Sequence, residues 1–148
     1  MSLPLQPAHG YVIVVAAAIS MHCYVQGFYV GGLRKKYSLE YPDSGSGRLS
    51  TKLSDAQWHT FNCAQRAHQN YLESLPFVLI TLVLASIQFP LFAASAGVGV
   101  LVGRQFYCSG YRANGPQGRS LGAGINGLSQ MSLFIATIVC GLQVAQVL

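Results

Sequence analysis

A run of polar side chains in residues 61–73 is the first feature of the sequence that could do chemistry. In this segment, FNCAQRAHQNYLE, the polar residues Asn62, Arg66, Gln69, Asn70 and Glu73 recur at steps of three and four. On an α-helix this spacing places a guanidinium, amides and a carboxylate on one face. Such groups are costly in a bilayer unless they meet partners, so the stripe predicts a functional site. The alternative is a stripe that only joins helices, for which one interhelical hydrogen-bonded pair would suffice.

A second polar face lies further along the chain. Arg104, Tyr107 and Tyr111 are also spaced by three and four, which places a guanidinium and two phenols on the same side of a helix. Arg112 and Arg119 follow before the next apolar segment. Lone tyrosines at a helix end are typical of interface anchors, but two beside an arginine favour a binding site. Because the cations gather at one membrane face, the predicted ligand is a small anion.

The elements that must position these residues follow from the distribution of charge. The chain has 148 residues, of which 51% are hydrophobic and 9% are charged, against roughly 25% charged residues in a soluble domain. Ten charged residues lie in residues 34–73 and three in residues 104–119, which leaves charge-free stretches at 1–33, 74–103 and 120–148. About 20 helical residues cross the hydrocarbon core, so the outer stretches each predict one membrane span. Pro90 divides the middle stretch into two antiparallel helices.

We therefore predict an all-α, integral membrane four-helix bundle. The single domain covers residues 1–148, with helices at about 9–35, 60–89, 91–112 and 119–146. The first helix is a retained anchor, because it lacks the basic n-region of a signal peptide and its apolar run is too long. The loop of residues 40–60 contains YPDSGSG and is the segment that we expect to be disordered.

The basic residues also predict how the chain crosses the membrane. Seven of the nine lie in the first and third loops, whereas the second turn and both termini carry no Lys or Arg. These seven are Arg34, Lys35, Lys36, Arg48, Lys52, Arg112 and Arg119. The positive-inside rule then places both basic loops in the cytosol.

Because most basic residues flank the predicted membrane spans, the net charge of +5 does not indicate a nucleic-acid partner. The cysteine spacing fits no zinc site, so we expect no metal. Glycine pairs at Gly97 and Gly99 and at Gly122 and Gly124 predict close helix packing.

Residues 61–73 closely resemble the signature of the membrane-associated proteins in eicosanoid and glutathione metabolism (MAPEG), and within them the type 3 microsomal glutathione S-transferases. Residues 34–37 (RKKY) and 40–42 (EYP) resemble the first-loop motif of that branch, and Arg104, Tyr107 and Tyr111 resemble its third-helix motif. The likeness extends over nearly the whole chain. It implies a homotrimer in the endoplasmic reticulum membrane, with glutathione bound between adjacent subunits.

The resemblance also implies roles for individual residues. The glutathione-binding residues would be Arg34, Arg66, His68, Asn70, Glu73, Tyr107 and Tyr111, of which Arg34 and His68 would come from a neighbouring subunit. Arg119 matches the arginine that stabilises the thiolate, and Lys35 matches an arginine of leukotriene C synthase that is proposed to act on the electrophile. Ser74 stands where that enzyme has a pocket tyrosine.

The implied function is that of a membrane glutathione transferase with glutathione peroxidase activity. Glutathione would be the co-substrate, and a lipophilic electrophile or lipid hydroperoxide would arrive from the membrane lipid; conjugation like that of leukotriene C synthase is included. One alternative is a non-catalytic scaffold or lipid-presenting protein of the same family, which Arg66 and Arg119 disfavour. Another is a proton-coupled exporter, which is disfavoured because the first, third and fourth helices contain no acidic residue.

Overall fold

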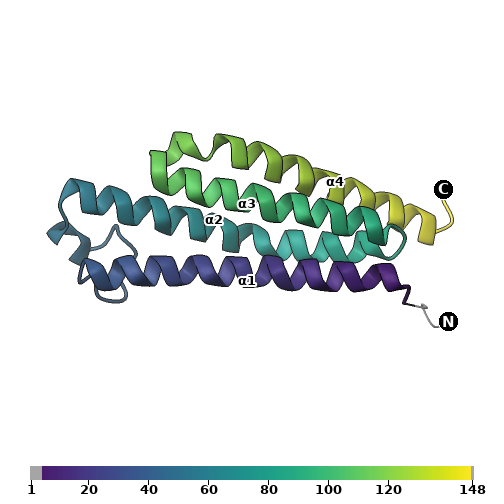
Figure 1. The fold of residues 1–148 in the computed structure, drawn as a ribbon, viewed down its shortest axis with the longest axis horizontal. Helices are drawn as coiled ribbons and strands as arrows, with labels where there is room; N and C mark the ends of the chain where they lie inside the picture. The colour runs from purple at the N-terminus through teal and green to yellow at the C-terminus, as the bar shows by residue number, and fades with distance from the viewer. Residues whose placement is uncertain (1–4, 148) are drawn as a thin grey trace.

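The chain folds into an elongated bundle of four long helices (Figure 1). The computed structural model describes residues 5–147, and in that range the secondary structure is entirely helical. The helices are α1 (Pro7–Lys36), α2 (Asp55–Ser86), α3 (Pro90–Gly118) and α4 (Ser120–Val144), and a short 3-10 helix, η1 (Leu49–Lys52), lies between α1 and α2. Both basic loops lie at one end of the bundle and both chain ends at the other (Figure 1). The predicted fold class is confirmed.

Three of the helices, α1, α3 and α4, are long and apolar enough to cross a membrane by length and composition. The second helix differs because three charged residues, Asp55, Arg66 and Glu73, interrupt it, and its longest charge-free part is residues 74–86. At 32 residues, α2 is about 48 Å long, which exceeds the hydrocarbon thickness. It packs against α1, α3 and α4, so its polar half lies beside apolar helices.

The helix boundaries differ from the predicted ones where local hydrogen bonds decide them. The second helix begins at Asp55, ahead of the expected residue 60, because Ser54 and Gln57 form a capping box. It ends at Ser86, and Pro90 opens α3, which confirms the predicted proline turn. Helical dihedral angles in α3 are interrupted at Asn114 and Gly115, close to the expected end at residue 112, and Gly115 has a φ of 66°.

The loop between α1 and α2 is folded, so the prediction of disorder is wrong. The carboxylate of Asp43 accepts hydrogen bonds from the backbone N–H groups of Gly45, Gly47 and Ser50 at 2.7, 3.0 and 2.8 Å. The Nδ2 group of Asn62 donates to the Gly45 carbonyl at 2.9 Å and ties the loop to α2. One carboxylate thus binds three backbone N–H donors of a segment that forms no regular helix or strand.

Glycines allow α3 and α4 to approach closely. An added Cβ at Gly122 would overlap the backbone of Tyr107, and one at Gly103 would lie 2.6 Å from the backbone nitrogen of Asn126. An added Cβ at Gly97 would instead meet a side chain, with Cγ1 of Val15 of α1 at 2.6 Å. Gly124 has no neighbour within 4 Å inside the protomer, so it takes no part in close packing there. The close seam fixes the α3–α4 turn, where the second polar face ends.

Candidate functional site

A buried arginine, Arg104, joins α3 to the polar stripe of α2. Its side chain is 1% exposed. Nη1 donates a hydrogen bond to Oδ1 of Asn70 at 2.8 Å, and Nη2 donates to Oγ of Ser74. Its Cζ atom lies 4.8 Å from the ring centroid of Tyr71 and 5.4 Å from that of Tyr107. The charge is therefore stabilised by neutral hydrogen-bond acceptors and aromatic faces, while Nε is buried without a partner in residues 5–147.

The rings of Tyr107 and Tyr111 lie between Arg104 and Arg119, which is at the basic end of the bundle. The ring centroids of Tyr107 and Tyr111 are 5.8 Å apart, and Cζ of Arg119 lies 5.5 Å from the Tyr111 centroid. Arg119 is exposed and directly precedes α4. The structure thus places Arg104, Tyr107 and Tyr111 on one face, as their spacing predicts. This line ends at the exposed guanidinium of Arg119 beside the N-terminus of α4, where the helix dipole also favours an anion.

The polar stripe of α2 divides into two parts with different surroundings. Arg66, Gln69 and Glu73 are exposed, and Nη1 of Arg66 donates to Oε1 of Gln69 at 3.2 Å. Asn62 instead binds the loop, and Asn70 turns inward to Arg104. The expectation that all five residues face one ligand is wrong for Asn62, because its side-chain amide is hydrogen-bonded to the first loop. The outer part presents a guanidinium and a carboxylate outside the protomer.

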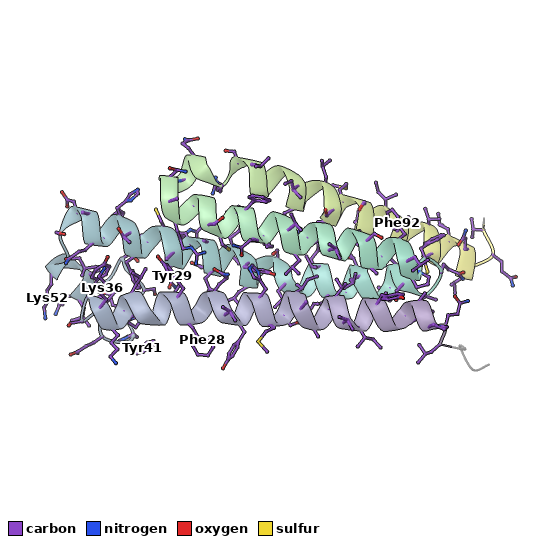
Figure 2. All side chains as sticks on the ribbon, viewed as in Figure 1. Phe28, Tyr29, Lys36, Tyr41, Lys52 and Phe92 are labelled. Carbon is purple, nitrogen blue, oxygen red and sulfur yellow. The ribbon has the colours of Figure 1, made fainter. Side chains whose placement is uncertain are left out.

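Arg34 and Lys35 lie at the loop end of α1. Nη1 of Arg34 donates to the carbonyl oxygens of Leu39 and Glu40, both at 3.2 Å, and its Cζ lies 4.2 Å from the Tyr41 centroid. Lys35 is exposed. Both side chains line a surface cavity of about 320 Å³, close to the exposed Lys36 and Tyr41 shown in Figure 2. Glu40 also lines this cavity, so one carboxylate lies beside the two cations.

His68 faces α1 of its own protomer. Its ring lies against Gly27, where an added Cβ would be 3.3 Å from the imidazole. Its Nδ1 atom is buried without a hydrogen-bond partner in residues 5–147. Within one protomer, the expected site residues thus form separate groups on α1, on the outer face of α2 and along α3.

A comparison of the sequence with models of known protein families finds a match over most of the chain. Residues 12–139 match the family model of the MAPEG family. This chain belongs to the MAPEG family. The matched range runs from within α1 to within α4 and contains every site residue described above. MAPEG proteins include glutathione transferases and related proteins. In this MAPEG protein, the predicted binding residues lie in separate groups on α1, α2 and α3 of one protomer.

Two polar features escaped the sequence reasoning. The first is the hydrogen bond from Arg104 to Ser74, a residue that attracted attention only for the tyrosine it replaces. The second is a group in the apolar parts of α1 and α3 that comprises His22, Gln26, Gln105 and Arg112. The sequence does contain a pattern that indicates this group. His22 and Gln26 are four residues apart on α1, and Gln105 and Arg112 are seven apart on α3, so each pair lies on one helix face.

Proposed function

We propose that this MAPEG protein is a membrane glutathione transferase with glutathione peroxidase activity, related to the type 3 microsomal branch. It activates the thiol of glutathione for attack on lipophilic electrophiles or lipid hydroperoxides, and conjugation like that of leukotriene C synthase is within its range. The observation that supports this proposal is the line of Arg104, Tyr107, Tyr111 and Arg119. It connects a buried anchor to an exposed cation at the basic end of the bundle.

Glutathione recognition needs groups for two carboxylates and one ammonium. In this proposal the exposed guanidinium of Arg66 binds one carboxylate, and Glu73 receives the ammonium. Arg34 of a neighbouring subunit binds the second carboxylate, and His68 of that subunit contacts the peptide. Asn70, which Arg104 holds in place, contacts the peptide from the other side, and Tyr107 and Tyr111 complete the pocket.

Arg119 supplies the chemical step by stabilising the thiolate. A free thiol has a pKa of about 8.5, so little thiolate exists at neutral pH without a nearby cation. The guanidinium of Arg119 and the N-terminal dipole of α4 both favour the anion. The position of Arg119 beside the Tyr111 ring, rather than beside an acid, supports this role.

The two reactions share the thiolate. With an electrophile, sulfur forms a bond to carbon while the bond to the leaving group or epoxide oxygen breaks, and Lys35 assists the departing oxygen. With a hydroperoxide, sulfur attacks the terminal oxygen, the O–O bond breaks, and an alcohol and a sulfenic acid form. A second glutathione then yields the disulfide and water. Two thiols are oxidised for each hydroperoxide reduced, and no metal takes part.

A trimer would complete the site. The outer groups of α2, Arg66 and Glu73, face away from their own protomer, so a neighbouring subunit is needed to enclose a ligand there. We propose a homotrimer in the endoplasmic reticulum membrane with both basic loops in the cytosol. Glutathione then enters from the cytosol, and the second substrate enters laterally from the lipid.

The test measures thiolate formation and turnover in the same preparation. Purified protein mixed with glutathione should show the ultraviolet absorbance of a thiolate. Arg119→Ala should fold normally, lose this signal and reduce turnover about a hundredfold or more, the scale of removing one group that stabilises a developing anion. Arg48→Ala removes an exposed loop arginine and is the matched control. Arg66→Ala should chiefly weaken glutathione binding.

Two outcomes would contradict the proposal at different points. Full turnover in Arg119→Ala would remove the role of this arginine but leave a glutathione enzyme. No thiolate signal and no turnover in the wild-type protein would favour the non-catalytic, lipid-presenting alternative.

A further inference from the structure

A groove of about 510 Å³ lies between α1 and α3, away from the residues of the proposed glutathione site. Most of its lining is apolar and consists of Ala18, Met21, Leu101, Val102 and Phe106. The two polar lining residues are His22 and Gln105. His22 lies at the middle of α1 and Gln105 at the middle of α3. The polar pair therefore lies near the midplane of a bilayer that these helices span.

The pair belongs to a hydrogen-bonded network that α2 supports from behind. Nε2 of His22 lies 2.9 Å from Oε1 of Gln105 and 3.2 Å from Nε2 of Gln26. Nδ1 of His22 lies 3.3 Å from the hydroxyl of Tyr71, which donates to the carbonyl of Ile19. Tyr71 is fully buried, and it is two residues from Glu73, so the two side chains point to opposite sides of α2. The groove and the outer stripe of α2 are thus on different faces.

Gln105 is exposed in this groove, although it lies in an apolar helix. Its amide carries both a donor and an acceptor, and His22 engages one of them. The amide Nε2 group has no hydrogen-bond partner in residues 5–147, and an unpaired polar group is costly at the middle of a bilayer. A ligand with a hydroxyl at this depth would satisfy it, because a hydroxyl can donate or accept.

Arg112 lies at the basic end of the same seam. It is seven residues after Gln105, so it lies on the same face of α3 and about 10 Å nearer the basic loops. Nη1 of Arg112 donates to Oε1 of Gln26 at 2.9 Å, and Cζ lies 4.3 Å from the ring centroid of Tyr29. Tyr29 lies on the loop-end half of α1 (Figure 2). Both contacts are neutral, so a half-buried cation at the membrane interface remains available to an anion.

We propose that the α1–α3 groove binds a fatty acid that carries a hydroxyl or hydroperoxyl group part-way along its chain. The carboxylate pairs with Arg112, the chain follows the apolar groove, and the oxygen of the chain hydrogen-bonds to Gln105. The acid has the orientation of a lipid in the cytosolic leaflet, with its charged end at the basic loops. The ligand belongs to the class of the second substrate in the proposed function, and its orientation rests on the topology proposed there. The groove lies apart from the proposed glutathione site, so this binding does not need glutathione.

The experiment compares ricinoleic acid with oleic acid, which differ by one mid-chain hydroxyl. Full-length protein in phosphatidylcholine nanodiscs should bind radiolabelled ricinoleic acid saturably and about fivefold more tightly than oleic acid, the ratio expected from one hydrogen bond. Gln105→Leu should abolish this preference and leave oleic acid binding unchanged. Arg112→Gln should weaken the binding of both acids about tenfold, because it removes a charge-assisted contact.

Matched controls separate these effects from general damage. Gln143→Leu repeats the Gln-to-Leu exchange at an exposed position of α4, and Arg48→Gln repeats the Arg-to-Gln exchange in the first loop. Both control variants should bind the two fatty acids like the wild type. Gln105→Met is a second variant if Gln105→Leu fails to fold. Three results would overturn the proposal. They are fatty-acid binding that does not saturate, equal affinities of the wild-type protein for the two acids, and a preference for ricinoleic acid that persists in both Gln105 variants. Excess glutathione should not displace ricinoleic acid. Displacement would mean that the two ligands share a site, which contradicts the proposal of a separate one.

Discussion

Arg104 is a charged side chain inside a helix bundle, and its neutral partners explain how the fold tolerates it. Arg104→Leu would leave Oδ1 of Asn70 and Oγ of Ser74 without their donor. We expect this change to lower the free energy of unfolding by about 2 kcal/mol, the usual cost of stranding buried acceptors. Denaturation in detergent micelles measures it, with Arg48→Leu as the exposed control. A variant as stable as the wild type would show that these hydrogen bonds contribute nothing net.

Asp43 determines the pH response of the first loop. Burial opposes its ionisation, but the N–H groups of Gly45, Gly47 and Ser50 outweigh burial and hold its pKa below the ordinary value. A lowered pKa in the folded state means that the ionised form stabilises the loop above the unfolded-state pKa of about 3.9. This stabilisation is lost as the pH falls through the lower, folded-state pKa.

The amide resonance of Gly45 should therefore titrate with a midpoint below that of a free aspartate. At neutral pH, Asp43→Asn should speed tryptic cleavage of the loop at Arg48 and Lys52. The three backbone hydrogen bonds use both carboxylate oxygens, and Asn replaces one oxygen by an NH2 group that cannot accept. Asp55→Asn changes an exposed acid at the start of α2 and should leave cleavage unchanged. Equal cleavage rates in wild type and Asp43→Asn would contradict this account.

Between elements, the α3–α4 seam depends on positions without side chains. Gly122→Ala should destabilise the bundle by about 1–3 kcal/mol, because a Cβ there would overlap the backbone of Tyr107 and force the helices apart. Gly124→Ala, two residues further along, meets open space and should be neutral or slightly stabilising. Thermal unfolding of the two purified variants provides the measurement. Equal losses in both variants would contradict this account, because Ala is the better helix former and only Gly122 is closely packed within the protomer.

The same seam carries a functional consequence. Gly122 packs against Tyr107, which belongs to the line that ends at Arg119. Separation of α3 from α4 would shift Arg119 away from the tyrosines. The spacing of the two helices thus positions the cation of the proposed thiolate site.

For the whole molecule, the arrangement of the helices places both basic loops at one end (Figure 1). In sealed microsomes, Ser46→Cys should react with a membrane-impermeant maleimide added outside, because we place this loop in the cytosol. Gln146→Cys, at the opposite end, should react only after permeabilisation. The four native cysteines are buried, so they give a low background. The reverse labelling pattern would invert the proposed direction of glutathione access.

Charge distribution and side-chain spacing were sufficient to predict most of the architecture. Three charge-free stretches and Pro90 specify four helices, because a bilayer requires long apolar segments with internally satisfied backbones. The steps of three and four also place Arg104, Tyr107 and Tyr111 on one face. These are local properties of a helix and do not depend on which helices become neighbours.

Which polar groups find partners could only be decided by tertiary packing. Spacing cannot reveal that Asn70 turns inward to Arg104 while Arg66 and Glu73 remain outside, because all three share one stripe. Likewise, spacing cannot reveal that Asn62 leaves the stripe to donate a hydrogen bond to the carbonyl of Gly45 in the first loop. A hydrogen bond needs atoms within about 3 Å, and only the packed bundle brings residues separated along the chain to that distance.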